Sequence, residues 1–429
     1  MDYKMNLTQE ELDILNGSKG EAMAKVMKTL VMYGDAFGAT KMVPVTSKMG
    51  HLVTSFGLKV MKPVYDLMDQ LIAGGALSGQ KFTVDPKPLD PKVPANLLQK
   101  LVFNKFMYSM QDSYDAQLTK LGLLDSKSYT CTCYMDEVGN KPAKGDVLSW
   151  AESSAVVYAN SVLGARCNRN SGIIELFGSI VGFVPYFGLL TDEGRKATWV
   201  VEIKTTKKPE AQILGSAIGM KVMEDVPYVK GLDKWIGTEL DGDATAYLKD
   251  FGAATASNGA VGLYHIANLT PEAVEQGEAL IAEGAKTYVI DDAELDRVKA
   301  NYPIMWKDKN AKPKLCFVGC PHLSRAQLIE TIEKLRREIP DIALRTTLIT
   351  GFPGETQEQH EELMDFVDQM EFDRLGVFTY SPEEDTPAAS MPDQSPEEVK
   401  EERQAELMEL QQDIVFDQAE DRIGEELLV

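Results

Sequence analysis

The chain has 429 residues, a formal net charge of −22 and 44% hydrophobic residues, a composition typical of a globular protein with two or three domains. No apolar run reaches the roughly 18–20 residues that span a bilayer, and the start of the chain lacks the apolar core of a signal peptide, so we expect neither membrane insertion nor secretion. Five cysteines at irregular spacing do not form a disulfide framework, so we expect a cytoplasmic protein with reduced thiols.

The negative charge is concentrated at one end of the chain. Residues 329–429 contain 28 acidic and 8 basic residues, whereas residues 1–328 contain 38 and 36. All five cysteines and all four tryptophans also precede residue 329. This shift indicates two segments of different character, and the acidic second segment argues against a nucleic-acid partner.

The first predicted elements are two helices and a short strand. Thr8 and Glu11 form a capping box that opens the first helix, and a second helical pattern covers residues 20–33. Asp35 follows between two glycines, just before the apolar residues 42–45. Loops at strand ends often carry functional side chains, so Asp35 is a candidate site residue, although a plain connection has the same spacing.

The stretch from residue 149 to 172 has an unusual composition for a helix. Ser149 and Glu152 form a second capping box, which predicts a helix that starts here. Serine and asparagine then interrupt alanine, valine and leucine, so that a ligand or another backbone can approach closely. Arg166 and Arg169 follow, and guanidinium groups match carboxylate and phosphate oxygens. The stretch is therefore either the wall of an anion-binding pocket or a tightly packed helix with a solvated polar end.

Beyond this stretch, strand patterns alternate with helix patterns. A glycine-containing helix is predicted over residues 211–223, and a loop of small residues over 252–260. The predicted strands cover residues 198–205, 261–266, 286–290 and 313–318. This alternation predicts a mainly parallel α/β architecture.

Two cysteines are candidate metal ligands. Cys131 and Cys320 each follow a β-like stretch, and Cys320 precedes Pro321 and His322 at a predicted helix entry. Such a position lowers the pKa of a thiol and favours metal ligation. Two ordinary buried thiols are the alternative, because the chain has no close pair of the Cys-x-x-Cys type.

The second segment predicts a simple βαβ unit followed by a long acidic helix. The strands cover residues 343–350 and 375–380, and Thr356 with Gln359 caps the helix between them. Ser395 opens the acidic helix, with proline at the first helical position.

Several motifs together resemble the large, catalytic subunit of the aconitase X family. They are residues 33–39, 43–45, 130–132, 149–172 and 315–324, and the resemblance covers residues 1–328. It implies an aconitase-like, multi-layer α/β region that belongs to an iron–sulfur hydro-lyase. Members dehydrate small hydroxy acids such as phosphomevalonate or cis-3-hydroxy-L-proline, and many work with a small swivelling subunit that supplies a serine base.

The resemblance also implies roles for individual residues. Cys131 and Cys320 match cysteines that bind the iron–sulfur cluster, whose open iron acts as a Lewis acid. Arg166, Asn168 and Arg169 would bind the substrate, where a carboxylate and a phosphate fit two arginines equally well. The implied catalytic residues are Asp35, Ser47, Ser153, Ser154, Asn160 and Ser161.

The chain departs from the family in its cysteines. A third cluster cysteine is expected beyond Cys320, and this sequence has no cysteine there. Either Cys133, Cys167 or Cys316 substitutes, or the cluster does not assemble. We expect that assembly fails, because ligand geometry is strict. Residues 48–51 also differ from the usual loop of the family.

The second segment resembles a different family, the radical-SAM methylthiotransferases that modify a ribosomal-protein aspartate. The similarity covers residues 329–429 and corresponds to the second half of the barrel of that family. The Cys-x-x-x-Cys-x-x-Cys motif of that family is absent, so we expect a structural half-barrel that does not use S-adenosylmethionine.

The predicted junction between the two segments lies in a helix near residues 326–335. A gene fusion, a recombination product and an error of sequence assembly give the same pattern. A truncated hydro-lyase subunit is the leading interpretation. A methylthiotransferase and a non-catalytic fusion product are the alternatives.

Overall fold

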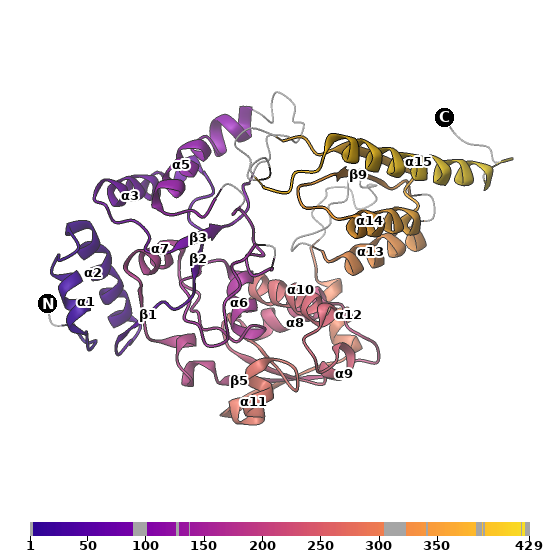
Figure 1. Ribbon diagram of the computed structural model, residues 1–429. Coiled ribbons are helices and arrows are strands. Elements are labelled where there is room, and N and C mark those ends of the chain that lie inside the picture. Colours follow the sequence, from indigo (N-terminus) through magenta and orange to yellow (C-terminus); the bar gives the residue numbers. More distant parts are fainter. Residues whose placement is uncertain are drawn as a thin grey trace. The chain divides into compact units, whose positions relative to one another are not determined.

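The computed structural model describes residues 3–88, 101–125, 128–136, 138–303, 323–339, 342–382, 388, 391–421 and 423–424 (Figure 1). It divides into two compact units, Met1–His322 and Leu323–Val429. The predicted α/β class is confirmed, because helices alternate with short, mostly parallel strands in both units.

The first part of unit 1 builds two small sheets under a layer of helices. Strands β1 and β4 pair antiparallel, and β2 and β3 pair parallel. The helices and strands are α1 (Gln9–Leu15), α2 (Glu21–Ala36), β1 (Met42–Pro44), β2 (Met49–Leu52), α3 (Lys62–Ala73), β3 (Lys81–Val84), a π-helical turn (Leu101–Met107), α5 (Gln111–Leu121), α6 (Ser153–Ser161), α7 (Gly172–Val181) and β4 (Phe183–Pro185). The capping box of Thr8 and Glu11 forms as predicted.

The second part of unit 1 contains a four-stranded parallel sheet in the order β7-β6-β5-β8. Its elements are β5 (Ala197–Ile203), α8 (Ala211–Val222), β6 (Pro227–Lys230), α9 (Asp233–Ile236), α10 (Gly242–Asn258), β7 (His265–Ile266), α11 (Pro271–Gln276), β8 (Ile281–Ile290) and α12 (Asp292–Ala300). Four short 3-10 turns complete the unit at Lys59–Met61, Gly188–Leu190, Glu193–Arg195 and Gly277–Leu280.

Helices α8 and α10 pack against each other at very short range, and Figure 1 shows them side by side. A Cβ atom at Gly215 would lie 2.5 Å from the Phe251 carbonyl oxygen, and one at Gly219 would lie 2.7 Å from that of Thr255. Only glycine permits this approach. The predicted helix over residues 211–223 is thus confirmed, and its glycines form the contact with α10.

A buried guanidinium connects the two parts of unit 1. Arg195 is 1% exposed, and its Nε donates to both carboxylate oxygens of Glu272 at 2.8 and 3.0 Å. The two Nη atoms donate to the side-chain and backbone oxygens of Asn160 and to the Leu189 carbonyl, at 3.0–3.2 Å. The guanidinium thereby joins α6, the turn at 188–190 and α11.

A second buried polar group lies in α7. Glu175 in α7 is 1% exposed, and it accepts hydrogen bonds from Ser149 Oγ at 2.8 Å and Asn170 Nδ2 at 2.7 Å. Burial raises the pKa of Glu175 to about 8, and the hydrogen bonds from Ser149 and Asn170 oppose that rise. Ser149 therefore anchors α7.

Several local predictions differ from the structure. Asp35 does not lie in a loop, because α2 continues to Ala36, and the strand predicted over residues 261–266 is limited to β7. Ser149 does not cap a helix, because α6 begins at Ser153 and Glu152 is its N-cap. Residues 252–258 are not a loop, because α10 continues to Asn258; alanine supports a helix, and the glycine in this stretch faces neighbouring side chains. The predicted strand over 313–318 lies outside the described residues.

Unit 2 is a small α/β layer. Its elements are α13 (Arg325–Glu338), β9 (Arg345–Thr350), α14 (Gln357–Met370), β10 (Arg374–Thr379) and α15 (Glu397–Asp421). Strands β9 and β10 pair parallel, as a βαβ unit requires, and the capping box of Thr356 and Gln359 forms as predicted. Among the described helices of both units, none has the length and apolar character needed to cross a bilayer.

The first prediction concerns the buried ion pair. Glu272→Gln should destabilise unit 1 by about 3–5 kcal/mol, because it leaves the Arg195 guanidinium charged, buried and without its counterion. Glu275→Gln on the same helix is the matched control: Glu275 is 56% exposed and pairs with Lys144, so its loss should cost less than about 1 kcal/mol. Urea unfolding monitored by tryptophan fluorescence measures both. Equal effects of the two substitutions would contradict the prediction.

The second prediction concerns Glu175. Its folded-state pKa of about 8 lies above the ordinary value of 4.5, so its contribution to stability is complete below about pH 4.5 and is lost as the pH rises through 8. The wild-type free energy of unfolding, relative to that of Glu175→Gln, should fall by more than about 1 kcal/mol between pH 5 and 8. A pH-independent difference would show that Glu175 titrates normally.

Candidate functional site

Three side chains from separate parts of unit 1 come together at the N-terminus of α6. His51 lies in β2, Asp85 directly follows the parallel strand β3, and Glu152 is the N-cap of α6. One nitrogen or oxygen atom from each of them lies within 4.8 Å of the others. Parallel pairing of β2 and β3 places His51 next to the end of β3, which explains how residues 34 positions apart meet.

The His51 ring is held firmly on one side. It is fully buried, and its Nδ1 lies 2.8 Å from Thr83 Oγ1. Asn140 Nδ2 donates to Thr83 Oγ1 and to the Gly50 carbonyl, each at 2.9 Å. The Trp150 ring packs edge-on at 5.8 Å between ring centroids. On the open side of the ring, Nε2 faces Asp85 Oδ1 at 3.4 Å.

The charges around His51 oppose the effect of burial. Burial alone lowers the pKa of a histidine, but the nearby Cys133 thiol and the Asp85 carboxylate outweigh it and raise the pKa of His51 to about 10. Burial raises the pKa of Asp85, and His51 partly counteracts that rise. The environment therefore favours a positive charge between the ring and the carboxylates.

Glu152 organises the N-terminus of α6. Its carboxylate accepts the backbone N–H groups of Ser154 at 2.9 Å and Ala155 at 2.5 Å. The hydroxyls of Ser153 and Ser154 donate to it at 3.4 and 2.6 Å. A carboxylate at this position is stabilised by the helix dipole.

Arg169 lies near this carboxylate with unused hydrogen-bonding capacity. Its Nη1 is buried and makes no hydrogen bond within the described part of the chain. The methylene groups of its side chain lie against Gly262, where a Cβ atom would come within 3.0 Å of them. Burial lowers the pKa of Arg169, and the Glu152 charge opposes that shift. A buried guanidinium nitrogen without a partner is suited to bind an anionic ligand.

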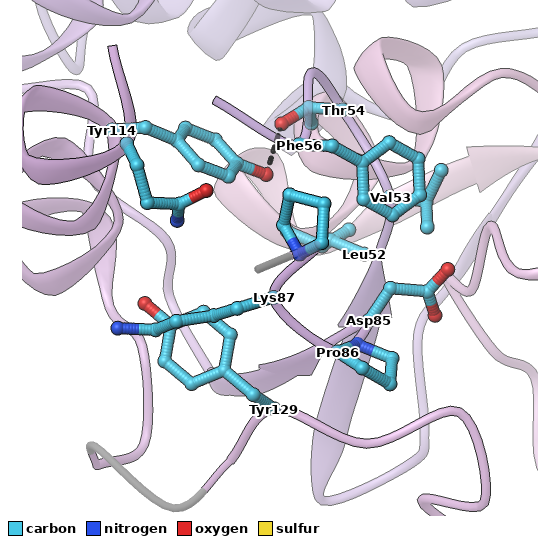
Figure 2. A pocket seen from close by; sticks show the side chains of 11 residues that line it. Leu52, Val53, Thr54, Phe56, Asp85, Pro86, Lys87, Tyr114 and Tyr129 are labelled. Atoms are coloured by element: carbon cyan, nitrogen blue, oxygen red, sulfur yellow. Dashed lines mark hydrogen bonds between the residues drawn. The ribbon is translucent and has the colours of Figure 1, made fainter. Parts of the chain in front are cut away.

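A pocket adjoins this cluster through Asp85 (Figure 2). It encloses about 230 Å³ that is partly open to solvent. Tyr114 Oη and Thr54 Oγ1 are 2.6 Å apart on one wall, and Lys87 Nζ lies 4.5 Å from the centre of the Tyr129 ring on another. Its lining is Leu52, Val53, Thr54, Phe56, Asp85, Pro86, Lys87, Pro88, Gln111, Tyr114 and Tyr129.

Only part of the predicted site residues come together here. Ser153, Ser154 and Arg169 lie around Glu152, as the shared hydrogen bonds and charge effects show. Ser47 lies upstream of His51 and donates to the Met49 carbonyl at 3.2 Å.

The other predicted residues bind to the protein itself. Arg166 donates to the Leu190 carbonyl at 2.8 Å and pairs with Asp192 at 2.5 Å. Most of the remaining contacts are to backbone groups: Asn160 binds Cys167 and Gly262 in addition to the Arg195 side chain, Ser161 binds Tyr264, Asn168 binds Phe187 and Leu189, and Asp35 binds Lys4 and Met5. In this structure these side chains are engaged within the protein.

The thiols described do not provide a cluster-binding set. Cys131 is half-buried and Cys133 is buried near His51. Cys167 contacts the Trp150 and Asn168 carbonyls at 3.4 and 3.3 Å, and burial raises its pKa well above the ordinary value, so it stays a neutral thiol. Cys316 and Cys320 lie outside the described residues. Within the described ranges, the one group of three metal-ligating side chains contains no cysteine. These residues therefore do not fit a three-cysteine iron–sulfur cluster.

His51, Asp85 and Glu152 are not among the predicted site residues, and Glu152 is predicted only as part of a capping box with Ser149. One signal is present in the sequence: Asp85 directly follows the short β-like run 82–84, and polar side chains at strand ends often serve a site. The meeting of His51 with Asp85 depends on the β2–β3 pairing, which local patterns do not show.

Comparison with known proteins gives two separate results for the two segments. Residues 4–193 match the description "Aconitase X first domain", and residues 197–300 match "Aconitase X second domain". By contrast, 103 residues are 64% identical to the ribosomal protein uS12 methylthiotransferase RimO of Lachnoclostridium phytofermentans, of which they span 23%.

Longer matches cover most of the chain. The phosphomevalonate dehydratase large subunit of Thermococcus kodakarensis is 33% identical over 77% of this chain and 78% of its own length. The phosphomevalonate dehydratase large subunit of Methanocaldococcus jannaschii is 31% identical over 78% of this chain and 79% of its own length. The crystal structure of Thermococcus kodakaraensis aconitase X in its holo-form aligns with a TM-score of 0.64 and 28% identity, over 90% of this chain and 91% of that chain. Through the segment that these matches share, the chain belongs to the aconitase X family.

Proposed function

We propose that this chain is the large subunit of a hydro-lyase that dehydrates a small hydroxy acid, and that it retains the substrate-binding part of the site but lacks a complete set of cluster ligands. Family membership and the phosphomevalonate dehydratase large subunits among its relatives support the reaction class. A phosphomevalonate-like substrate, a small partner subunit and a cytoplasmic location follow from the same similarity.

One observation carries the proposal: the buried, unused Nη1 of Arg169 beside the N-terminus of α6. A buried guanidinium nitrogen without an acceptor costs free energy, and an anion that accepts from Nη1 removes that cost. The carboxylate or phosphate of a hydroxy acid supplies the missing acceptor.

The surrounding groups are suited to elimination of water from such a substrate. Dehydration removes a proton from one carbon and the hydroxyl from its neighbour, so the leaving hydroxyl needs a donor. Ser153 and Ser154 lie where they can orient that hydroxyl, and the positive charge favoured at His51 stabilises negative charge that develops on the leaving oxygen. The base that takes the proton is expected on the small subunit, by resemblance to the family.

The iron–sulfur cluster of the family is not supported by the described thiols, and about a fifth of the relatives' length has no counterpart in the match. The replacement segment supplies no cysteine. We infer that catalysis by this chain is impaired at the cofactor, while substrate binding is intact.

Unit 2 has a structural role in this proposal. Glu355 lies in a turn that resembles a cofactor-proximal turn of the methylthiotransferases, but its carboxylate already accepts from Gly351 N at 3.1 Å and from Arg403 Nη1 at 2.7 Å. These bonds hold the turn to α15 and leave Glu355 engaged within the protein.

The third prediction tests Arg169. Arg169→Gln should weaken binding of phosphomevalonate about 10–100-fold, since it removes hydrogen bonds between a charged group and the ligand anion. Isothermal titration calorimetry of the full chain measures this change. Arg166→Gln is the matched control, because the Arg166 guanidinium already donates to the Leu190 carbonyl and to Asp192. The affinity of this variant for phosphomevalonate should stay within about twofold of that of the wild type. Equal losses in both variants would assign the effect to folding.

The fourth prediction tests the cofactor. After anaerobic reconstitution with iron and sulfide, the chain should retain well under one equivalent of acid-labile sulfide, because the chain has no cysteine beyond Cys320 and the thiols among the described residues form no group of three. Brown protein with stoichiometric iron and sulfide would contradict this. Cys167→Ser serves as a control that should leave the result unchanged, since this thiol is neutral and bonded to backbone carbonyls.

A further inference from the structure

The buried atoms of His51 and Asp85 that face each other lack the hydrogen bonds that burial demands. His51 Nε2 and Asp85 Oδ1 are both buried, and neither has a hydrogen-bond partner within the described ranges. They are 3.4 Å apart with poor alignment. Buried polar atoms are almost always satisfied, so two that face each other point to a missing species between them.

The orientation of the histidine ring directs Nε2 into this space. Thr83 Oγ1 can accept from His51 Nδ1–H at 2.8 Å and donate to the Gly50 carbonyl at 3.4 Å, while Asn140 donates to the same oxygen. This arrangement aims Nε2 at the carboxylates, so that loss of its proton would expose a lone pair to an ion between them. Histidines that bind metals are typically held in this way, with the second ring nitrogen donating to a fixed acceptor.

Glu152 completes the set of donors. Its nearest ligand atom lies within 4.8 Å of those of His51 and Asp85. Two of its hydrogen bonds come from the serine hydroxyls of residues 153 and 154, which can rotate and release a lone pair without moving the backbone. The backbone N–H bonds from α6 keep the carboxylate in place.

We propose that His51, Asp85 and Glu152 form a binding site for a single divalent transition-metal ion of the Zn²⁺ or Fe²⁺ class. One imidazole with two carboxylates favours these ions over Mg²⁺ and Ca²⁺, which prefer oxygen ligands alone. Three protein ligands leave positions open for water or a substrate oxygen. The site is separate from any iron–sulfur cluster because it uses no thiolate, and it does not rest on the proposed dehydratase activity.

The test uses the full-length chain, stripped of metal by a chelator and titrated with Co²⁺ alone. We expect one equivalent to bind tightly, with d–d absorption but without the intense charge-transfer band of a cobalt–thiolate bond. Zn²⁺ should displace it and raise the melting temperature. Where a proton occupies Nε2 in the metal-free protein, binding should release it, so affinity should fall as the pH is lowered.

Asp85→Asn is the decisive variant, because it keeps the shape of the side chain and removes the charge. It should weaken Co²⁺ binding by at least about 10-fold and leave the metal-free melting temperature near that of the wild type. His360→Gln is the matched control. His360 is likewise buried, and its Nε2 lies 2.7 Å from Glu406 Oε2. Because this histidine is paired with a single carboxylate, its substitution should not change Co²⁺ binding. Should Asp85→Asn fail to fold, Glu152→Gln carries the same test.

Three results would overturn the proposal. They are the absence of stoichiometric Co²⁺ binding to the wild type, equal affinity in the wild type and the folded site variant, and a thiolate charge-transfer band, which would assign the ion to Cys133 or another cysteine. If Co²⁺ does not bind to the wild type, the species between His51 and the two carboxylates is a proton on the ring and not a metal ion.

Discussion

The buried Arg195 guanidinium is the constraint on which the arrangement of unit 1 depends. Its hydrogen bonds reach Asn160 in α6, the Leu189 carbonyl and Glu272 in α11, so three segments from both family domains share one charge. A buried cation tolerates few alternative geometries, because each lost bond leaves a charge without solvation. Arg195 therefore holds α6 in position through Asn160, which lies in the C-terminal half of the helix.

Fixing α6 also fixes the site, because the candidate residues gather at the other end of the same helix. Glu152 caps it, and the paired strands β2 and β3 bring His51 and Asp85 to that cap. Much of the polarity in the 149–172 stretch serves the scaffold, since Asn160 and Asn168 satisfy turn backbones, whereas Arg169 keeps capacity for a ligand.

Unit 2 follows simpler rules. Capped helices and parallel strands arise from local patterns, and Val367, Val377 and Leu407 pack into a small core on one side of the sheet. On the strands themselves, Ile349 and Phe378 are register partners and are each 60% exposed. Exposed apolar neighbours on a two-stranded sheet are consistent with a segment that evolved inside a larger sheet.

The sequence by itself determined the α/β class, the capped helices of Thr8 and Thr356, and the family of the first segment, because these depend on local periodicity and on motifs. Tertiary structure alone decided which polar residues of the 149–172 stretch are engaged within the protein. Asn160 and Arg169 belong to the same polar stretch, yet Asn160 binds backbone carbonyls, whereas Arg169 Nη1 has no partner within the described residues. The meeting of His51 with Asp85 and Glu152 depends on strand pairing and helix placement, and long-range contacts of this kind leave no periodic pattern in the chain.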